Sequence, residues 1–152
     1  IVTLKRHKSI DLVIIDYLQL ISEKSGNSKY EQITNISRGL KLAAKDAHIP
    51  IIVLSQLSRV VESRNSTVPK LSDLRDSGAI EQDADQVLFL YRPSYYGIDQ
   101  NDKGDDISNL CEVHLAKNRH GEINYISLDY DPSVGIFKDW EYPKTYEEKK
   151  LL

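Results

Sequence analysis

Residues 11–20, with the sequence DLVIIDYLQL, decide the fold of this chain. Four apolar residues, Leu12 to Ile15, follow one another without alternation, and Asp16 comes directly after them. An uninterrupted apolar run is typical of a strand that is covered on both faces, as in a parallel sheet between helices. In open α/β sheets the ligand binds beyond the carboxyl ends of the strands. We therefore expect Asp16 to lie at the edge of the sheet where a ligand binds.

Asp16 itself has two interpretations. An aspartate at the end of a buried strand is the pattern of the Walker B magnesium site of P-loop ATPases, where a carboxylate supplies an oxygen ligand to the metal. The same pattern also fits a simple polar turn after a strand, because Asp is a common turn residue. The stretch on its own leaves both interpretations open.

The composition indicates one globular domain or a piece of one. Of the 152 residues, 40% are hydrophobic and 28% are charged, and the formal net charge is -3. This charge neither requires nor excludes nucleic acid, since a binding protein can confine its positive charge to one channel. The single cysteine, Cys111, excludes an internal disulfide and favours a reducing, cytoplasmic compartment. No apolar run approaches the roughly 20 residues that a membrane span needs.

Downstream of the first run, helix and strand signals alternate. Ser28 and Glu31 have the spacing of a capping box and predict a helix that ends at His48 and Pro50. A second apolar run, Ile51–Leu54, predicts a second buried strand. The remaining expected elements are a polar loop over 57–70, a turn and short helix over 71–85, a strand over 86–91, a mobile surface loop over 92–109, and strands over 110–116 and 123–129 that flank a turn at 117–121.

The last two strands are short and close, so we expect an antiparallel hairpin at an edge of the sheet. The fold class is therefore α/β, with a mostly parallel sheet. We expect four sites to meet at one sheet edge: Asp16, Gln56, the 71–85 segment and the turn KNRHG at 117–121. Cys111 is interpreted as a small core residue, and His114 as a packed or a surface histidine rather than a ligand. Tyr95 and Tyr96 are expected to pack the base of their loop, with a position near a nucleotide base as the alternative.

Four segments resemble the ATPase domain of the hexameric, DnaB-type replicative DNA helicases in their order and spacing. They are DYLQL at 16–20, SQLSR at 55–59, LSDLRDSGAIEQDAD at 71–85 with FLYR after it, and AKNRHG at 116–121. The resemblance covers nearly all of residues 10–138, and the 71–85 segment is its most specific part. It implies part of a RecA-like P-loop ATPase core over residues 1–139, with helices on both faces of the sheet, followed by a charged tail over 140–152.

The resemblance also implies a site for ATP and Mg²⁺. Asp16 matches the Walker B aspartate, a metal ligand, and Gln56 matches the sensor glutamine, whose amide can bond a γ-phosphate. Lys117 and Arg119 match the arginine finger and its partner lysine, which in the family reach the ATP of the neighbouring subunit. Without the resemblance, Gln56 also fits a polar strand cap, and Lys117 with Arg119 fits a basic hairpin turn on a solvated face.

A DNA contact is implied for the 71–85 segment. Arg75, Asp76 and Gly78 match the loop that lines the central channel of the hexamer and touches single-stranded DNA. Arg75 can contact a phosphate, and Gly78 allows the backbone N–H groups to approach one. Asp76 stands where the family usually has Glu. The segment also fits a helix N-terminus with Asp76 as its cap. Since 71–85 has no aromatic residue, we expect contacts to the DNA backbone that are independent of sequence.

One motif of the family is missing from the sequence. No G-x-x-x-x-G-K-[ST] phosphate-binding loop occurs, and the chain begins at Ile1. In the family that loop and the catalytic Glu lie upstream. We therefore expect a piece of a longer helicase that unwinds duplex DNA at the replication fork, and we expect this chain alone to be inactive. Implied partners are single-stranded DNA, further copies in a homo-hexamer, a helicase loader and primase, in the bacterial nucleoid.

Two alternatives stay open at this point. The chain could be a truncated, non-catalytic module that keeps its contacts with subunits and DNA but does not bind ATP. It could also belong to a RecA-like recombination ATPase, which the 71–85 segment fits poorly.

Overall fold

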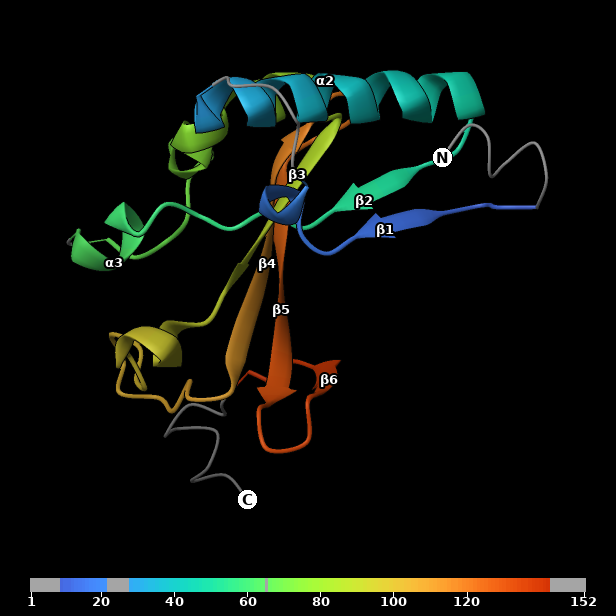
Figure 1. Ribbon diagram of the computed structural model, residues 1–152. Helices are drawn as coiled ribbons and strands as arrows, with labels where there is room; N and C mark the ends of the chain where they lie inside the picture. The colour runs from blue at the N-terminus through green and yellow to red at the C-terminus, as the bar shows by residue number, and fades with distance from the viewer. Residues whose placement is uncertain (1–8, 22–27, 65, 143–152) are drawn as a thin grey trace. The chain divides into compact units, whose positions relative to one another are not determined.

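A computed structural model describes residues 9–21, 28–64 and 66–142, except for the side chains of residues 75–77 (Figure 1). The chain divides into two compact units. The first consists of Ile1–Val61 and Lys70–Asp85, and the second of Glu62–Pro69 and Gln86–Leu152. Among the described residues, none of the helices is long and apolar enough to cross a membrane.

The two apolar runs of the first unit form a pair of parallel strands, as Figure 1 shows. Strand β1 (Val13–Ile15) pairs with β2 (Ile51–Val53). The side chains of Ile14 and Ile52 are 62% and 52% exposed, whereas their neighbours along each strand are half-buried. The expected cover on both faces is therefore not found, because the described residues supply packing partners to one face only.

Helix α2 (Lys29–Ala47) begins with the expected capping box. The Glu31 N–H donates to Ser28 Oγ (3.3 Å), and the Ser28 N–H donates to the Glu31 carboxylate (2.9 Å). The helix ends at His48, whose backbone is left-handed with φ 51°. The predicted helix is confirmed at both ends, and Ile33 on its apolar face is buried.

The 71–85 segment forms a 3₁₀ helix, η2 (Leu71–Ser77), followed by α4 (Gly78–Asp83), which confirms the predicted turn and short helix. Its N-terminal carboxylate is Asp73, which accepts a hydrogen bond from the Lys70 N–H (2.7 Å). Asp76 lies inside η2 and not at its start, and its side chain is outside the description, so the alternative with Asp76 as a cap is not tested.

Helices α2 and α4 pack together and are joined by polar side chains. Ser37 Oγ donates to the Asp83 carboxylate (2.9 Å), and Lys41 forms an ion pair with Asp85. The predicted loop over 57–70 is in part helical, because α3 (Val60–Ser63) forms there. Its Val61 is 2% exposed, whereas Val60 is 63% exposed, so a single buried apolar side chain anchors a turn of helix in a segment of polar composition.

The second unit is an antiparallel sheet in the order β3-β4-β5-β6, of which β3, β4 and β5 are the long strands in Figure 1. The strands are β3 (Gln86–Tyr91), β4 (Leu110–Asn118), β5 (Asn124–Asp131) and β6 (Ile136–Asp139). The expected hairpin is confirmed as β4–β5. Strand β6 was not predicted, and in the described residues antiparallel pairing outweighs the single parallel pair. The expectation of a mostly parallel sheet is corrected accordingly.

Strand β3 has one buried face and one exposed face, although all but one of its residues are apolar. Val87, Phe89 and Tyr91 are at most 8% exposed, whereas Leu88 and Leu90 are 58% and 67% exposed. Fully apolar strands are normally covered on both sides. The second unit therefore presents an uncovered apolar surface on β3.

The 92–109 loop is more structured than a surface loop without secondary structure. It contains the 3₁₀ helix η3 (Pro93–Tyr96) and an isolated β-bridge between Gln100 and Asp106. Asn101 closes the turn between them, since its side-chain oxygen accepts from the Lys103 and Asp105 N–H groups (both 2.9 Å). Local side-chain hydrogen bonds of this kind are what Asn contributes to turns.

Candidate functional site

Asp16 and Gln56 lie at the carboxyl end of the same parallel pair. Ile15, the last residue of β1, is opposite Val53, the last residue of β2. Asp16 therefore follows one strand and Gln56 the other, and both side chains are exposed. The two residues belong to one edge of the sheet, as the sequence predicts. The Asp16–Tyr17 peptide bond is cis.

The backbone pairing continues beyond the two strands. The Leu54 N–H donates to the Ile15 carbonyl, and the Leu18 N–H donates to the Leu54 carbonyl (both 2.9 Å). Leu18 begins the 3₁₀ helix η1 (Leu18–Leu20) and is 1% exposed. The turn after Asp16 is therefore fixed to the end of β2 by its backbone and by a buried side chain.

Gln19 makes the side-chain contacts between these two turns. Its Nε2 donates to Ser55 Oγ (3.0 Å) and to the Gln56 carbonyl (3.4 Å), and its Oε1 accepts from the Gln56 N–H (3.4 Å). Gln19 is not among the site residues predicted from the sequence. The one signal in the sequence that could have indicated Gln19 is its position, a primary amide in the turn that follows a predicted buried strand.

Asp16 has the chemistry of a magnesium ligand at a phosphate site. Within the described ranges, no group of three or more His, Cys, Asp or Glu side chains could hold a metal ion. Asp16 is thus not part of such a group, and Mg²⁺ is commonly held by one or two carboxylates together with waters and substrate phosphates. Asp16 therefore fits a Mg²⁺ ion that binds together with the phosphates of a nucleotide.

Lys117 and Arg119 lie at one end of the β4–β5 hairpin. The expected turn over 117–121 is shorter than predicted, because β4 continues through Asn118 and places Lys117 inside the strand, opposite Val87. Arg119 is exposed in the turn itself. Basic side chains two residues apart are thus held at a strand end and in the adjoining turn.

The turn that carries Arg119 is closed by a neighbouring amide. Asn118 Nδ2 donates to the Glu122 carbonyl (3.2 Å), and Asn118 Oδ1 accepts from the His120 N–H (3.3 Å). A Cβ atom at Gly121 would lie 2.8 Å from Asn118 Nδ2. Glycine at 121 therefore leaves room for the amide that closes the turn.

The three predicted DNA-contacting residues lie where η2 meets α4. Arg75 and Asp76 are in η2, and their side chains are outside the description. Gly78 has right-handed helical angles, φ -50° and ψ -25°, and a Cβ atom there would meet only Tyr30 Oη, at 3.9 Å. The fold of this chain does not require glycine at 78, so the expected close approach of a phosphate stays a prediction.

The predicted meeting of all four segments at one edge is tested only in part. Asp16, Gln56 and the 71–85 segment belong to the first unit, and Lys117 and Arg119 belong to the second. Within the first unit, the chain after Gln56 reaches the 71–85 segment, because the Ser58 N–H donates to the Asp73 carbonyl (3.1 Å). The structure therefore connects the first three sites, and a common edge with the hairpin stays a prediction.

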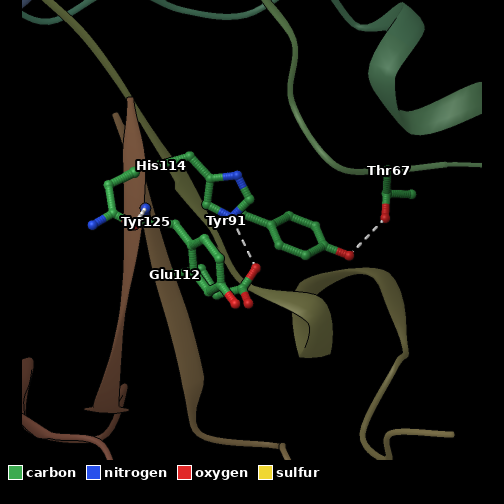
Figure 2. Close-up of polar contacts among 6 residues, drawn as sticks. Thr67, Tyr91, Glu112, His114 and Tyr125 are labelled. Carbon is green, nitrogen blue, oxygen red and sulfur yellow. Dashed lines mark hydrogen bonds and ion pairs between the residues drawn. The ribbon is translucent and has the colours of Figure 1, made fainter. Parts of the chain in front are cut away.

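The polar and aromatic residues on one face of the second unit pack against one another, as Figure 2 shows. The His114 ring lies between those of Tyr91 (6.2 Å between centroids) and Tyr125 (5.7 Å). Its Nε2 is 2.9 Å from the Glu112 carboxylate, and Tyr91 Oη is 3.0 Å from Thr67 Oγ1. His114 is thus a packed histidine, which is one of the two positions that the sequence leaves open.

Two other residues with reactive side chains also have packed positions. Cys111 is 2% exposed, and burial raises the pKa of its thiol, as expected for a small core residue. Tyr96 stacks on Tyr91 with 5.9 Å between ring centroids, and burial raises the pKa of its hydroxyl. Tyr95 contacts the edge of Tyr96 but is 69% exposed, so only Tyr96 packs the base of the loop.

Comparison with known protein families identifies the family of this chain. Residues 1–139 match the DnaB-like helicase C terminal domain family. The chain belongs to this family. The family membership confirms the resemblance seen in the four segments of the sequence.

Individual DnaB-like proteins agree with this assignment. The chain is 46% identical over 134 residues to a protein named "Probable plasmid replicative DNA helicase" from Chlamydia muridarum, and the match covers 88% of this chain and 27% of the relative. A solved structure described as an ATPase domain matches with a TM-score of 0.79 and 43% identity, over 91% of this chain and 48% of the other. The chain thus spans under a third of the curated relative and about half of that ATPase domain.

A second solved structure is described as a DnaB-like replicative helicase and its interactions with primase. It also matches with a TM-score of 0.79 and 43% identity, over 91% of this chain and 33% of the other. The α/β fold class is confirmed by both structures. DnaB-like helicases with ATPase domains use a nucleotide and a metal ion in general, and a primase-binding helicase is among the structural neighbours.

Proposed function

We propose that this chain is the C-terminal half of the ATPase domain of a hexameric, ATP-dependent replicative helicase that unwinds duplex DNA at the replication fork. One observation carries the proposal: the carboxylate of Asp16 and the amide of Gln56 stand exposed at the carboxyl edge of one parallel pair. Family membership and the relatives' names support it. In the complete helicase that we propose, a part that carries the phosphate-binding loop precedes this chain.

The roles of the residues follow from their chemistry. Asp16 would hold Mg²⁺, which supplies positive charge to the phosphates of ATP during transfer. Gln56 would donate its amide to the γ-phosphate and lose that bond after hydrolysis. The Ser58–Asp73 hydrogen bond gives the chain after Gln56 a direct contact with η2, the segment assigned to DNA. Lys117 and Arg119 would contact the ATP of the neighbouring subunit.

Replacement of Asp16 tests this function. In the complete helicase, Asp16→Asn keeps the size of the side chain but removes the charge, so ATP turnover and unwinding should fall roughly 100-fold or more. Phosphate release is measured over a series of Mg²⁺ concentrations. Asp102→Asn, in an exposed turn of the other unit, serves as the matched control. Normal turnover by the Asp16 variant would remove Asp16 from the metal site.

The DNA assignment gives a separate prediction. Arg75→Ala should weaken binding of single-stranded DNA about equally for all sequences, because a phosphate contact carries no base information. It should also lower the slope of log affinity against log salt by about 1. Titrations at several salt concentrations measure both effects, with Arg38→Ala on the exposed side of α2 as the control. An unchanged slope would exclude Arg75 from the channel.

A second function is compatible with the same residues, because the proposed subunit contact at Arg119 and the proposed DNA contact at Arg75 do not themselves require hydrolysis of ATP. The chain would then be a non-catalytic module that binds subunits and DNA without hydrolysing ATP. Genomic sequence upstream of the Ile1 codon discriminates between the two. A phosphate-binding loop in frame supports the helicase, whereas a stop codon or a promoter supports the module. Primase and a helicase loader are proposed partners of the helicase form, and the primase-binding neighbour supports the first of these.

A further inference from the structure

We infer that Gln19 is a positioning residue that fixes the backbone of Gln56 and couples it to the turn that carries Asp16. This inference rests on the proposed function, because it assigns Gln19 a part in the ATP cycle only if Gln56 senses the γ-phosphate. Gln19 would touch neither nucleotide nor metal. It would affect ATP hydrolysis by setting the direction in which the Gln56 side chain points.

The contacts of Gln19 match both polar groups of one backbone unit. A primary amide carries a donor and an acceptor side by side, and here it pairs with the carbonyl and the N–H of the same residue, Gln56, at 3.4 Å each. A neighbouring strand makes the same type of paired contact in an antiparallel ladder. Ser55 Oγ accepts a third hydrogen bond at 3.0 Å. The two hydrogen bonds to the Gln56 backbone restrain its φ and ψ angles. These angles set the direction in which the Gln56 side chain leaves the backbone.

Gln19 is itself held in a fixed place. It follows Leu18, which is 1% exposed and whose N–H donates to the Leu54 carbonyl (2.9 Å). Leu54 in turn donates to the Ile15 carbonyl, next to Asp16. A displacement of Gln56 therefore reaches the Asp16 turn by two connected routes, the Gln19 amide and the backbone bonds of Leu54.

The chemistry of the pair predicts which replacements fail. Glutamate at 19 keeps an acceptor for the Gln56 N–H but has no donor for its carbonyl. Methionine has a similar length and packs similarly, but it lacks both the donor and the acceptor. Asparagine is one methylene shorter. Gln19→Met therefore removes the hydrogen bonds with little change in volume, and Gln19→Glu removes half of the pair.

The test is a double-mutant cycle in the complete helicase. Gln19→Met should lower kcat for ATP by about 10- to 100-fold, the range for residues that orient a catalytic group. KM should stay the same, because ground-state binding is not affected. The double variant with Gln56→Ala should be no slower than Gln56→Ala alone, since residues that act through one another are not additive. Amide hydrogen exchange at Gln56 should become faster in Gln19→Met.

The outcomes distinguish a failure of the positioning role of Gln19 from a failure of the sensor role of Gln56. If Gln56→Ala is fully active, the sensor assignment fails and the inference fails with it. If Gln56→Ala is slow but Gln19→Met is fully active, or if their effects add, only the inference fails. Gln100→Met, in an exposed loop of the second unit, controls for the substitution itself. Should Gln19→Met not fold, Gln19→Glu replaces it, and an unchanged kcat there overturns the inference.

Discussion

Arg119→Ala should lower ATP turnover of the complete helicase by about 10³-fold or more, the usual scale for an arginine finger. Arg119 is exposed in the turn that the Asn118 amide closes, so its side chain stands at the turn end of the β4–β5 hairpin. A planar, permanently charged fork stabilises the charge that develops on a transferring phosphoryl group. Nucleotide binding by an isolated subunit should be nearly unchanged, because the proposed contact of Arg119 is to a neighbour's ATP.

Mixed hexamers test whether Arg119 acts on the neighbouring subunit. Arg119→Ala subunits retain an intact Asp16, and Asp16→Asn subunits retain an intact finger. In a mixture, some interfaces combine the two intact halves, and turnover should return there. If no activity returns, the assignment in trans is wrong. His120→Ala, next to Arg119 in the same turn, controls for disturbance of the hairpin, and Arg119→Lys tests whether charge alone suffices.

The sequence predicted best those features that depend on residues close together in the chain. The capping box of Ser28 and Glu31 begins α2 as expected, and β3 has the predicted bounds, because caps and apolar runs are local signals. The positions of Asp16 and Gln56 at one edge also followed from the sequence, because each residue comes after one of two strands that were predicted to be parallel. Such features need no knowledge of what packs against them.

The missed features depend on contacts between distant residues. Strand β6 forms because Ile136 and Phe137 pair with Asp131 and Tyr130, and four residues before a charged tail gave little signal of this. The exposure of Ile14 could not be read from an apolar run, since burial depends on what covers the strand. Gln19 was missed because its partners lie 36 and 37 residues away.

The 152-residue chain by itself should neither bind ATP tightly nor hydrolyse it. P-loop sites hold phosphates with a ring of backbone N–H groups at a helix N-terminus and with a lysine. The sequence has no such motif, and in the proposed site Asp16 and Gln56 would supply only one contact each, to the metal and to the γ-phosphate. Arg119 is assigned to a neighbour's nucleotide, so it adds nothing to the chain's own site.

The exposed apolar residues predict a second property of the isolated chain. Ile14 and Ile52 on the parallel pair, and Leu88 and Leu90 on β3, are each more than half exposed. Contiguous exposed apolar surface of this kind favours association. The chain should therefore self-associate as its concentration rises, and sedimentation at several concentrations measures this. The variant Leu88→Gln with Leu90→Gln should associate less, and an unchanged monomer fraction would show that β3 is not the contact surface.

Calorimetry and phosphate release together test the nucleotide prediction. Residues 1–152 are titrated with Mg-ATP, and phosphate release is followed with and without single-stranded DNA. No heat of binding at micromolar ATP and no turnover are expected under either condition. Asp16→Asn in the same chain is the matched control, because it removes the metal ligand and leaves the apolar surfaces as they are. Micromolar binding, or turnover that Asp16→Asn abolishes, would mean that these residues form a complete nucleotide site without a phosphate-binding loop, and the division of the site between two halves would be wrong.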